Sequence, residues 1–82
     1  MRQYLDENRK YYKKIVCNQC GRELKLENGI VQEGVFFGDA RWGYFSKKDG
    51  EVHSFDLCEE CYGAWIKGFR LPVTVEDETE FL

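Results

Sequence analysis

The four cysteines of this sequence fall into two pairs with the same spacing. Cys17 and Cys20 form the first pair, and Cys58 and Cys61 form the second. A spacer of two residues lets both sulfurs of a pair turn toward one point, and four thiolates complete a tetrahedral site with Zn–S distances of about 2.3 Å. The spacing therefore predicts one structural metal ion held by all four cysteines.

Two other uses of paired cysteines fit less well. Disulfide frameworks belong to secreted domains, and the sequence opens on polar and charged residues rather than on a hydrophobic signal segment. A thioredoxin-like redox site uses one pair within a βαβ pattern, for which the chain is too short. We therefore favour a metal site in a reducing, cytoplasmic compartment.

The metal is expected to be zinc, with iron as the alternative. Four-sulfur tetrahedral sites serve both metals. Rubredoxin-type iron loops usually place glycine directly after each cysteine pair. Here Gly21 follows the first pair, but Tyr62 follows the second. This asymmetry favours Zn²⁺.

No catalytic constellation accompanies the cysteines, and we expect a protein that is not an enzyme. A hydrolytic zinc site keeps three protein ligands and an open position for water, whereas four cysteines close the site. Glu59 and Glu60 are better explained by the start of a helix than by acid–base chemistry. His53, the single histidine, is expected to pack in the second shell of the site.

Length and charge indicate one small soluble domain. The 82 residues predict a single zinc-stabilised domain over 1–82, with flexible ends at 1–10 and 76–82. The formal net charge is −3, and four of the last seven residues are acidic. No apolar run approaches the roughly 20 residues of a membrane span, so we expect no membrane partner.

The first half of the chain predicts short strands around the first cysteine pair. Residues 1–16 are ambiguous between helix and strand. We expect a helical or frayed first turn and then a strand that runs into Cys17. Residues 27–30 carry a turn signal in Asn28 and Gly29.

The second half predicts a hairpin followed by a helix. Strand-forming residues fill 35–37 and 41–46, and Gly38 between them predicts a bulge, a bend or a close approach. The remaining elements expected are a turn at 47–50, a return strand at 51–55, a helix with Asp56 as N-cap and Glu59 reaching back to it, a stop at Gly68 and Pro72, and a short edge strand at 72–75.

Taken together, these elements predict a small α+β domain of treble-clef type. It would consist of a zinc knuckle, a β-hairpin and one main α-helix that carries the second cysteine pair at its N-terminus. The unpaired N–H groups of the first helical turn favour thiolates at that position.

Residues 42–62, preceded by Val16-Cys-Asn-Gln-Cys-Gly21, resemble a group of small bacterial proteins with a treble-clef or zinc-ribbon pattern. The shared features are a Cys-x-x-Cys-Gly knuckle, an Asp-Gly turn and a His-x-Phe-x-Leu-Cys-x-x-Cys segment leading into a helix. The resemblance covers about residues 15–73 and departs from the pattern at Phe45, where glycine is expected. It implies zinc and a cytosolic bacterial protein, but no activity.

The aromatic residues point to a protein interface. They make up 16% of the chain, more than one small core requires. We expect Trp42, Tyr44, Phe45 and Trp65 to contact a partner protein or a second copy in a homodimer. The leading hypothesis is therefore an adaptor or regulatory module.

Two alternatives remain open. A nucleic-acid-binding zinc ribbon would use the basic aromatic segment at the N-terminus, whose residues are Arg2, Tyr4, Arg9, Lys10, Tyr11, Tyr12, Lys13 and Lys14. The acidic balance of the whole chain, with a pI near 5.1, weighs against it. The second alternative is a rubredoxin-like iron electron carrier.

Overall fold

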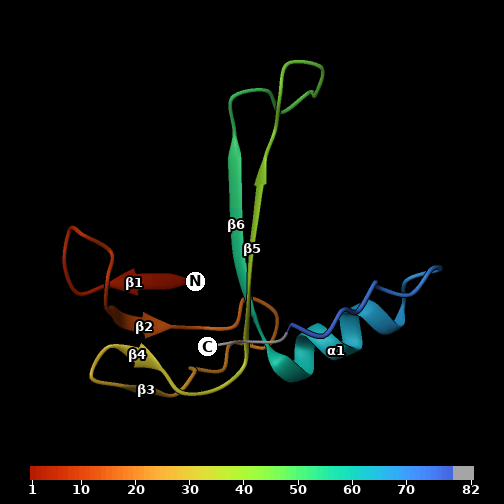
Figure 1. Ribbon diagram of the computed structural model, residues 1–82. Helices are drawn as coiled ribbons and strands as arrows, with labels where there is room; N and C mark the ends of the chain where they lie inside the picture. The colour runs from red at the N-terminus through yellow and green to blue at the C-terminus, as the bar shows by residue number, and fades with distance from the viewer. Residues whose placement is uncertain (79–82) are drawn as a thin grey trace.

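The computed structural model describes residues 1–78 as a small α+β arrangement of short antiparallel sheets and one helix (Figure 1). Each sheet has two strands, paired as β1 with β2, β3 with β4, and β5 with β6. In chain order the elements are β1 (Arg2–Tyr4), β2 (Tyr12–Ile15), β3 (Leu26–Glu27), β4 (Ile30–Val31), β5 (Val35–Arg41), β6 (Val52–Cys58) and α1 (Glu59–Lys67).

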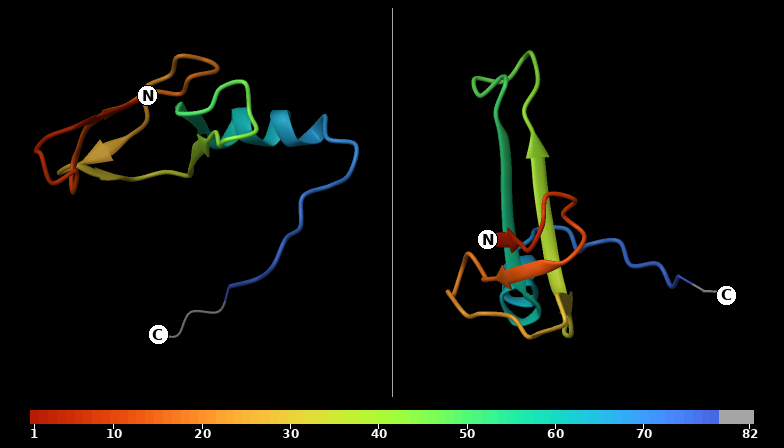
Figure 2. Two further views of the ribbon diagram at one scale, coloured as in Figure 1. Left: turned by 90° about the horizontal axis from the view of Figure 1, so that it is seen from above. Right: turned by 90° about the vertical axis from the view of Figure 1, so that its left-hand side faces the viewer.

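The β5–β6 hairpin is the longest element and projects from the rest of the molecule (Figures 1 and 2). Its register pairs Val35 with Cys58 at the base and Arg41 with Val52 at the far end. The predicted strand over 41–46 is wrong, because β5 ends at Arg41 and residues 44–50 form turns and a bend. The turn predicted at 47–50 is confirmed, and Gly50 supplies its left-handed φ of +92°.

The two faces of this hairpin are covered by different parts of the chain. On one face, the Phe36 ring lies 5.1 Å from Tyr62 of α1 and 5.6 Å from Trp65. On the other face, Phe37 stacks on Tyr12 of β2 with ring centroids 5.9 Å apart. Because side chains alternate along a strand, two consecutive phenylalanines of β5 pack on opposite faces of the hairpin.

The N-terminal segment forms a strand, and the helical turn expected there is wrong. β1 pairs antiparallel with β2, with Arg2 opposite Ile15. The Tyr4 and Tyr12 rings lie 5.2 Å apart across this pair. A helix over these residues would lose this cross-strand contact, so tertiary packing decides the ambiguous pattern. The strand predicted before Cys17 is confirmed by β2.

β3 and β4 form a minimal hairpin at the predicted turn of 27–30. Asn28 and Gly29 connect the strands with φ values of 52° and 78°. Two consecutive left-handed residues are typical of a type I′ turn, for which Asn-Gly is the favoured pair. This prediction is confirmed.

Helix α1 starts later than its capping pattern suggested. Its N-cap is Cys58, and Asp56 lies within β6 with no exposed surface. The capping-box prediction for Asp56 and Glu59 is therefore wrong, because the Asp56 carboxylate is paired with Arg2 instead. The helix ends at Lys67, and Gly68 is its C-cap.

The segment after α1 contains no strand within the described residues 68–78, so the edge strand predicted at 72–75 is wrong. Proline cannot donate a hydrogen bond to a sheet, and a short strand is stable only when a neighbouring strand pairs with it. In the part described, no strand lies beside this segment. The flexible end predicted for 76–82 lies partly outside the described residues, which stop at 78.

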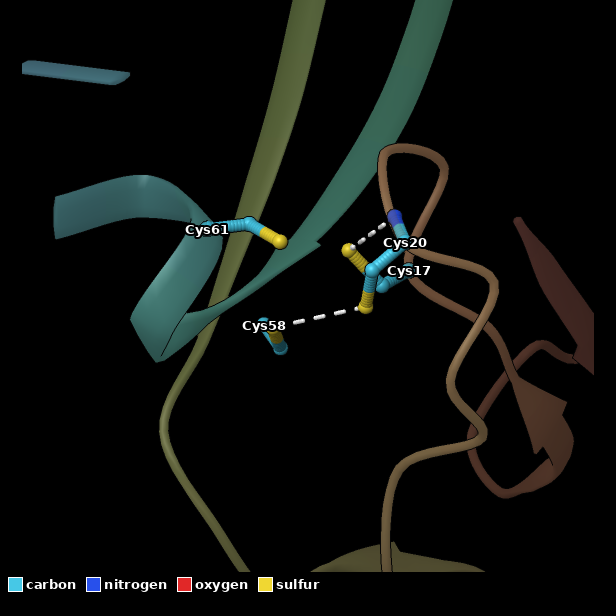
Figure 3. A group of neighbouring side chains, drawn as sticks. All are labelled: Cys17, Cys20, Cys58 and Cys61. Atoms are coloured by element: carbon cyan, nitrogen blue, oxygen red, sulfur yellow. Dashed lines mark hydrogen bonds between the residues drawn. The ribbon is translucent and has the colours of Figure 1, made fainter. Parts of the chain in front are cut away.

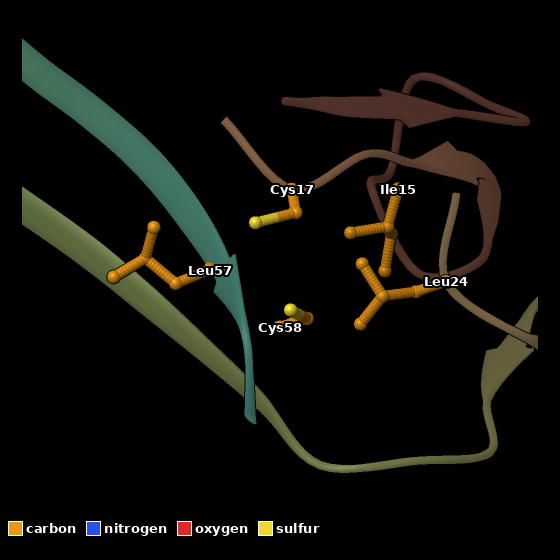
Figure 4. Close-up of a cluster of buried hydrophobic side chains, with 5 residues drawn as sticks. All are labelled: Ile15, Cys17, Leu24, Leu57 and Cys58. Atoms are coloured by element: carbon orange, nitrogen blue, oxygen red, sulfur yellow. The ribbon is translucent and has the colours of Figure 1, made fainter. Parts of the chain in front are cut away.

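The buried core is small and surrounds the cysteines (Figure 4). Its buried apolar residues are Ile15, Leu24, Leu57 and the two cysteines Cys17 and Cys58. No residue of α1 is fully buried. The fold therefore depends on what the cysteines hold as much as on apolar packing.

Candidate metal centre

All four cysteine sulfurs converge on one point (Figure 3). They lie within 4.8 Å of one another, and the Cys20 and Cys58 sulfurs are 3.9 Å apart. A tetrahedral zinc site with bonds of about 2.3 Å requires sulfurs about 3.8 Å apart. All four are free thiols. The donor set and its spacing thus fit a metal ion of this size.

The first cysteine pair sits in a tight knuckle whose backbone folds back on itself. The Gly21 N–H donates to the Cys17 carbonyl at 2.9 Å, and the Cys17 N–H donates to the Arg22 carbonyl at 2.9 Å. The Cys20 N–H points at the Cys17 sulfur, 3.5 Å away. Gly21 has a φ of +79°, which suits glycine.

The second pair spans the junction between β6 and α1. Cys58 is the last residue of the strand and the N-cap of the helix, and Cys61 lies in the first helical turn. The unpaired N–H groups of this turn and the positive end of the helix dipole favour thiolates over neutral thiols. The predicted placement of this pair at the helix N-terminus is confirmed.

Asn18 and Asp56 join the two halves of the site. The Asn18 N–H donates to the Asp56 carbonyl at 2.7 Å, and the Asp56 N–H donates to Asn18 Oδ1 at 2.9 Å. One partner follows Cys17, and the other lies two residues before Cys58. This reciprocal pair fixes the distance between the knuckle and β6.

The buried carboxylate of Asp56 is compensated by charge. Arg2 Nε lies 2.9 Å from one carboxylate oxygen, and the Met1 amino group lies 2.9 Å from the other. A buried carboxylate without such partners would cost several kcal/mol, so this pairing is what permits Asp56 to sit beneath the knuckle. β1 is thereby tied to the base of β6.

The thiols differ in how readily they ionise. Burial opposes ionisation of Cys17, but the N–H groups of Cys20, Cys58 and Gln19 outweigh it and lower its pKa to about 6. The Cys61 N–H lowers the pKa of Cys58, whereas the Cys58 sulfur and burial raise the pKa of Cys61 to about 12. Neighbouring thiolates repel one another, so a cation is needed before all four carry charge.

A second charged group lies beside the site. Arg22 pairs with Glu33 through two nitrogen–oxygen contacts of 2.8 and 3.2 Å. Glu33 and the Cys58 sulfur raise the pKa of Arg22, in that order of strength. In return, Arg22 holds the pKa of Glu33 down at about 2. A zinc ion with four thiolates has a net charge of −2, which this guanidinium partly balances.

His53 does not lie beside the cysteines, contrary to the second-shell expectation. Its side chain is exposed, Nε2 is 2.9 Å from Glu51, and its ring contacts Trp42 at 5.7 Å. His53 lies five positions before Cys58 on β6, about 17 Å at the usual rise per residue.

The four aromatic residues expected at an interface fall in two separate places. Tyr44 and Phe45 are 81% and 97% exposed in the loop at the far end of the β5–β6 hairpin. Trp65 lies on α1 at the hairpin's base. Trp42 lies under the ammonium group of Lys48, 4.9 Å from its ring centroid.

The residues that support the site were not found from the sequence. Asn18, Asp56, Arg2 and Arg22 are ordinary polar residues at spacings that match no motif. Asn18 carried one usable signal, since a short hydrogen-bonding side chain between two metal ligands is suited to bonding backbone groups. The partner of Asn18 lies 38 residues away, beyond the reach of local patterns.

No family model, curated protein or solved structure matches this chain. Among the described residues, no helix has the length and apolar character required to cross a membrane.

Proposed function

We propose that this chain is a structural zinc domain without enzymatic activity that acts through protein contacts. The observation that carries the proposal is the closed cluster of four sulfurs within 4.8 Å. Four cysteines saturate a tetrahedral ion and leave no position for water or substrate. When bound, the ion would supply folding free energy to the chain.

The order of elements supports a treble-clef arrangement. A knuckle with two cysteines precedes a β-hairpin, and the helix after that hairpin begins at the second pair. Zinc is favoured over iron by the residue after the second pair, which is Tyr62 rather than glycine. Free thiols suit the reducing conditions of the cytoplasm.

The interaction role rests on exposed aromatic side chains. Phe45 is 97% exposed and contacts Tyr44, with ring centroids 5.1 Å apart. Large rings left in water are costly unless a partner covers them, and aromatic residues are enriched at protein interfaces. The proposed adaptor would present them on a scaffold fixed by zinc.

Nucleic-acid binding is the second candidate, favoured by a polar cavity of about 900 Å³ lined in part by Arg2, Arg9 and Arg41. Two observations count against it. Arg2 is already paired with Asp56, and the Tyr4 ring is occupied by Tyr12 on one side and Arg9 on another. The test is the affinity for single-stranded DNA at increasing salt. An affinity that falls steeply between about 50 and 200 mM salt, as expected when lysines and arginines neutralise phosphates, would favour this candidate.

The metal assignment is tested by elemental analysis of purified protein alongside the Cys58→Ala variant. We expect one zinc per chain and no visible absorption in the wild type, and loss of metal with loss of dispersed amide signals in the variant. A coloured, iron-containing protein would replace zinc by the electron-carrier alternative. A variant that keeps metal and fold would refute the proposal.

A further inference from the structure

An apolar cavity of about 770 Å³ lies beside the candidate metal centre. Phe55 and Leu57 of β6 and Ala64 and Trp65 of α1 form its apolar walls, and Cys20 of the knuckle closes one side. Cavities of 300–1,000 Å³ are of the size that takes ligands or large side chains. Trp65, 44% exposed, leaves its rim open to solvent.

The loop at the far end of the β5–β6 hairpin, residues 42–51, carries what such a cavity would accept. It is a constrained structure, since the Trp42 N–H bonds the Glu51 carbonyl at 3.0 Å and the Ser46 N–H bonds Gly43 at 2.9 Å. The side chains of Tyr44 and Phe45 in this loop are almost fully exposed to solvent. A rigid loop loses little entropy when its rings are bound.

We propose that the loop of one copy inserts Tyr44 and Phe45 into this cavity of a second copy, and that the second copy does the same in return. This inference deepens the proposed interaction role and rests on it. A chain cannot fill its own cavity in this way, because the loop and α1 lie at opposite ends of the hairpin (Figure 1).

The dimensions are compatible with a reciprocal dimer. Leu57 at the cavity and Val52 beside the loop are five residues apart on β6, about 17 Å along the strand. Two hairpins lying antiparallel would therefore bring each loop to the other's cavity. The symmetry is twofold, in which each copy gives and receives the same contact.

The area is sufficient for a stable contact. An aromatic ring buries about 150–250 Å², so the rings of Tyr44 and Phe45, 81% and 97% exposed, offer together about 350 Å². Two loops and two cavity walls together bury about 1,400 Å², above the roughly 1,000 Å² that a biological interface requires.

The charges near the two surfaces are complementary. Lys47 and Lys48 follow the two rings in the loop, with Ser46 between Phe45 and Lys47. Glu60 lies four residues before Ala64 on α1, which places the two on neighbouring positions of one helical face. Lysines on one copy would thus approach an acidic rim on the other.

The test is the association state of the full chain, measured by analytical ultracentrifugation from 1 to 500 µM. We expect a dimer in the wild type and at least a tenfold weaker association for Tyr44→Ala/Phe45→Ala and for Ala64→Arg, which blocks the cavity. Leu71→Ala/Val75→Ala removes equally exposed apolar residues elsewhere and should leave the dimer unchanged.

Mixing the loop variant with the cavity variant distinguishes insertion from other contacts. A mixed dimer contains one intact loop facing one intact cavity, so it should associate more tightly than either variant alone. A monomeric wild type at 500 µM, a dimer that ignores the loop variant, or a mixture that stays monomeric would each overturn the inference.

Metal content separates this inference from the proposed function. The association of a variant is compared with that of the wild type only if the variant retains one metal ion per chain. Lys47→Glu/Lys48→Glu gives a second loop variant that leaves the apolar groups in place. A wild-type monomer with a full complement of zinc would refute the dimer while leaving the structural zinc domain intact.

Discussion

Asn18 connects the two cysteine pairs through hydrogen bonds to the backbone of Asp56 on both its N–H and its carbonyl. The cysteines supply the donor atoms, but their distances depend on residues that contact no metal. Such supporting groups commonly change metal affinity by one to two orders of magnitude. At the scale of single residues, the site consists of the four cysteines and the four residues that support them, Asn18, Asp56, Arg2 and Arg22.

The Asn18→Ala variant should weaken metal binding while leaving all four ligands in place. The Asp56 N–H, which is part of a buried segment, loses its acceptor, a loss that costs about 1–3 kcal/mol. Competition with a chromophoric zinc chelator should show affinity about tenfold lower or more. Gln19→Ala, in the same knuckle and with an exposed side chain, is the matched control. Equal affinities for the two variants would contradict the role of Asn18.

Arg22 should set how far the pH can fall before the metal is released. Its positive charge favours the Cys58 thiolate, whose pKa is below the ordinary value. A lowered pKa keeps the thiolate available to the metal until the pH falls through that value. Arg22→Gln removes a positive charge that favours the Cys58 thiolate, so acid release should begin at a higher pH than in the wild type.

Zinc release on acidification, followed with a fluorescent indicator, checks this shift. Arg70→Gln removes an exposed arginine outside the site and serves as the control. An Arg22→Gln protein that releases zinc at the wild-type pH would show that the guanidinium does not act on the cysteines.

At the scale of elements, the β5–β6 hairpin leaves no room for a side chain at Gly38. A Cβ built there would lie 2.8 Å from Phe36 Cε2 and 3.0 Å from Phe55 Cζ. Both rings also contact Trp65, so they have little room to move. Of the sequence-based alternatives for Gly38, the close approach is the one observed, while the register continues without a bulge.

Gly38→Ala should therefore destabilise the protein, by about 1–3 kcal/mol, because the methyl group forces the two rings apart. The midpoint of urea unfolding measures the change. Gly43→Ala is matched to it, since nothing lies within 4 Å of the added carbon at that position. A Gly38→Ala protein as stable as the Gly43→Ala protein would mean that the rings move aside freely.

Local sequence signals predicted the elements that local chemistry determines. The Asn28-Gly29 turn, the Gly50 turn, the strand before Cys17 and the helix after Cys58 follow from backbone preferences at those residues. The cysteine spacing indicated the site, and the structure brings its four sulfurs together. These features needed no knowledge of distant parts of the chain.

Three of the predictions that failed depended on distant parts of the chain. Arg2–Tyr4 became a strand because β2 pairs with it, and Asp56 left the helix cap because Arg2, 54 residues away, neutralises it. An aspartate before a helix has two uses, capping or ion pairing, and a local pattern cannot choose between them. Sequence proximity places His53 near the cysteines, whereas in the structure the extended strand β6 carries it away from them.

At the scale of the whole molecule, two layers on opposite faces of the β5–β6 hairpin meet at the cysteines. The β1–β2 and β3–β4 pairs occupy one side, and α1 occupies the other (Figure 2). Two-stranded sheets are marginal on their own, and the aliphatic side chains buried among the described residues are Ile15, Leu24 and Leu57. Neither layer has a core that would keep it folded once the link through the cysteines is gone.

Removing the metal with a chelator under reducing conditions should therefore unfold both layers in one transition. Amide signals of β1–β2 and of α1 should lose their dispersion together, and Trp65 fluorescence should shift to the red as the ring enters water. A protein in which only residues near the cysteines change, while both layers keep their signals, would show that apolar packing suffices. Restoring zinc should return the whole spectrum, because the ligands of an unfolded chain bind the ion only as the fold re-forms.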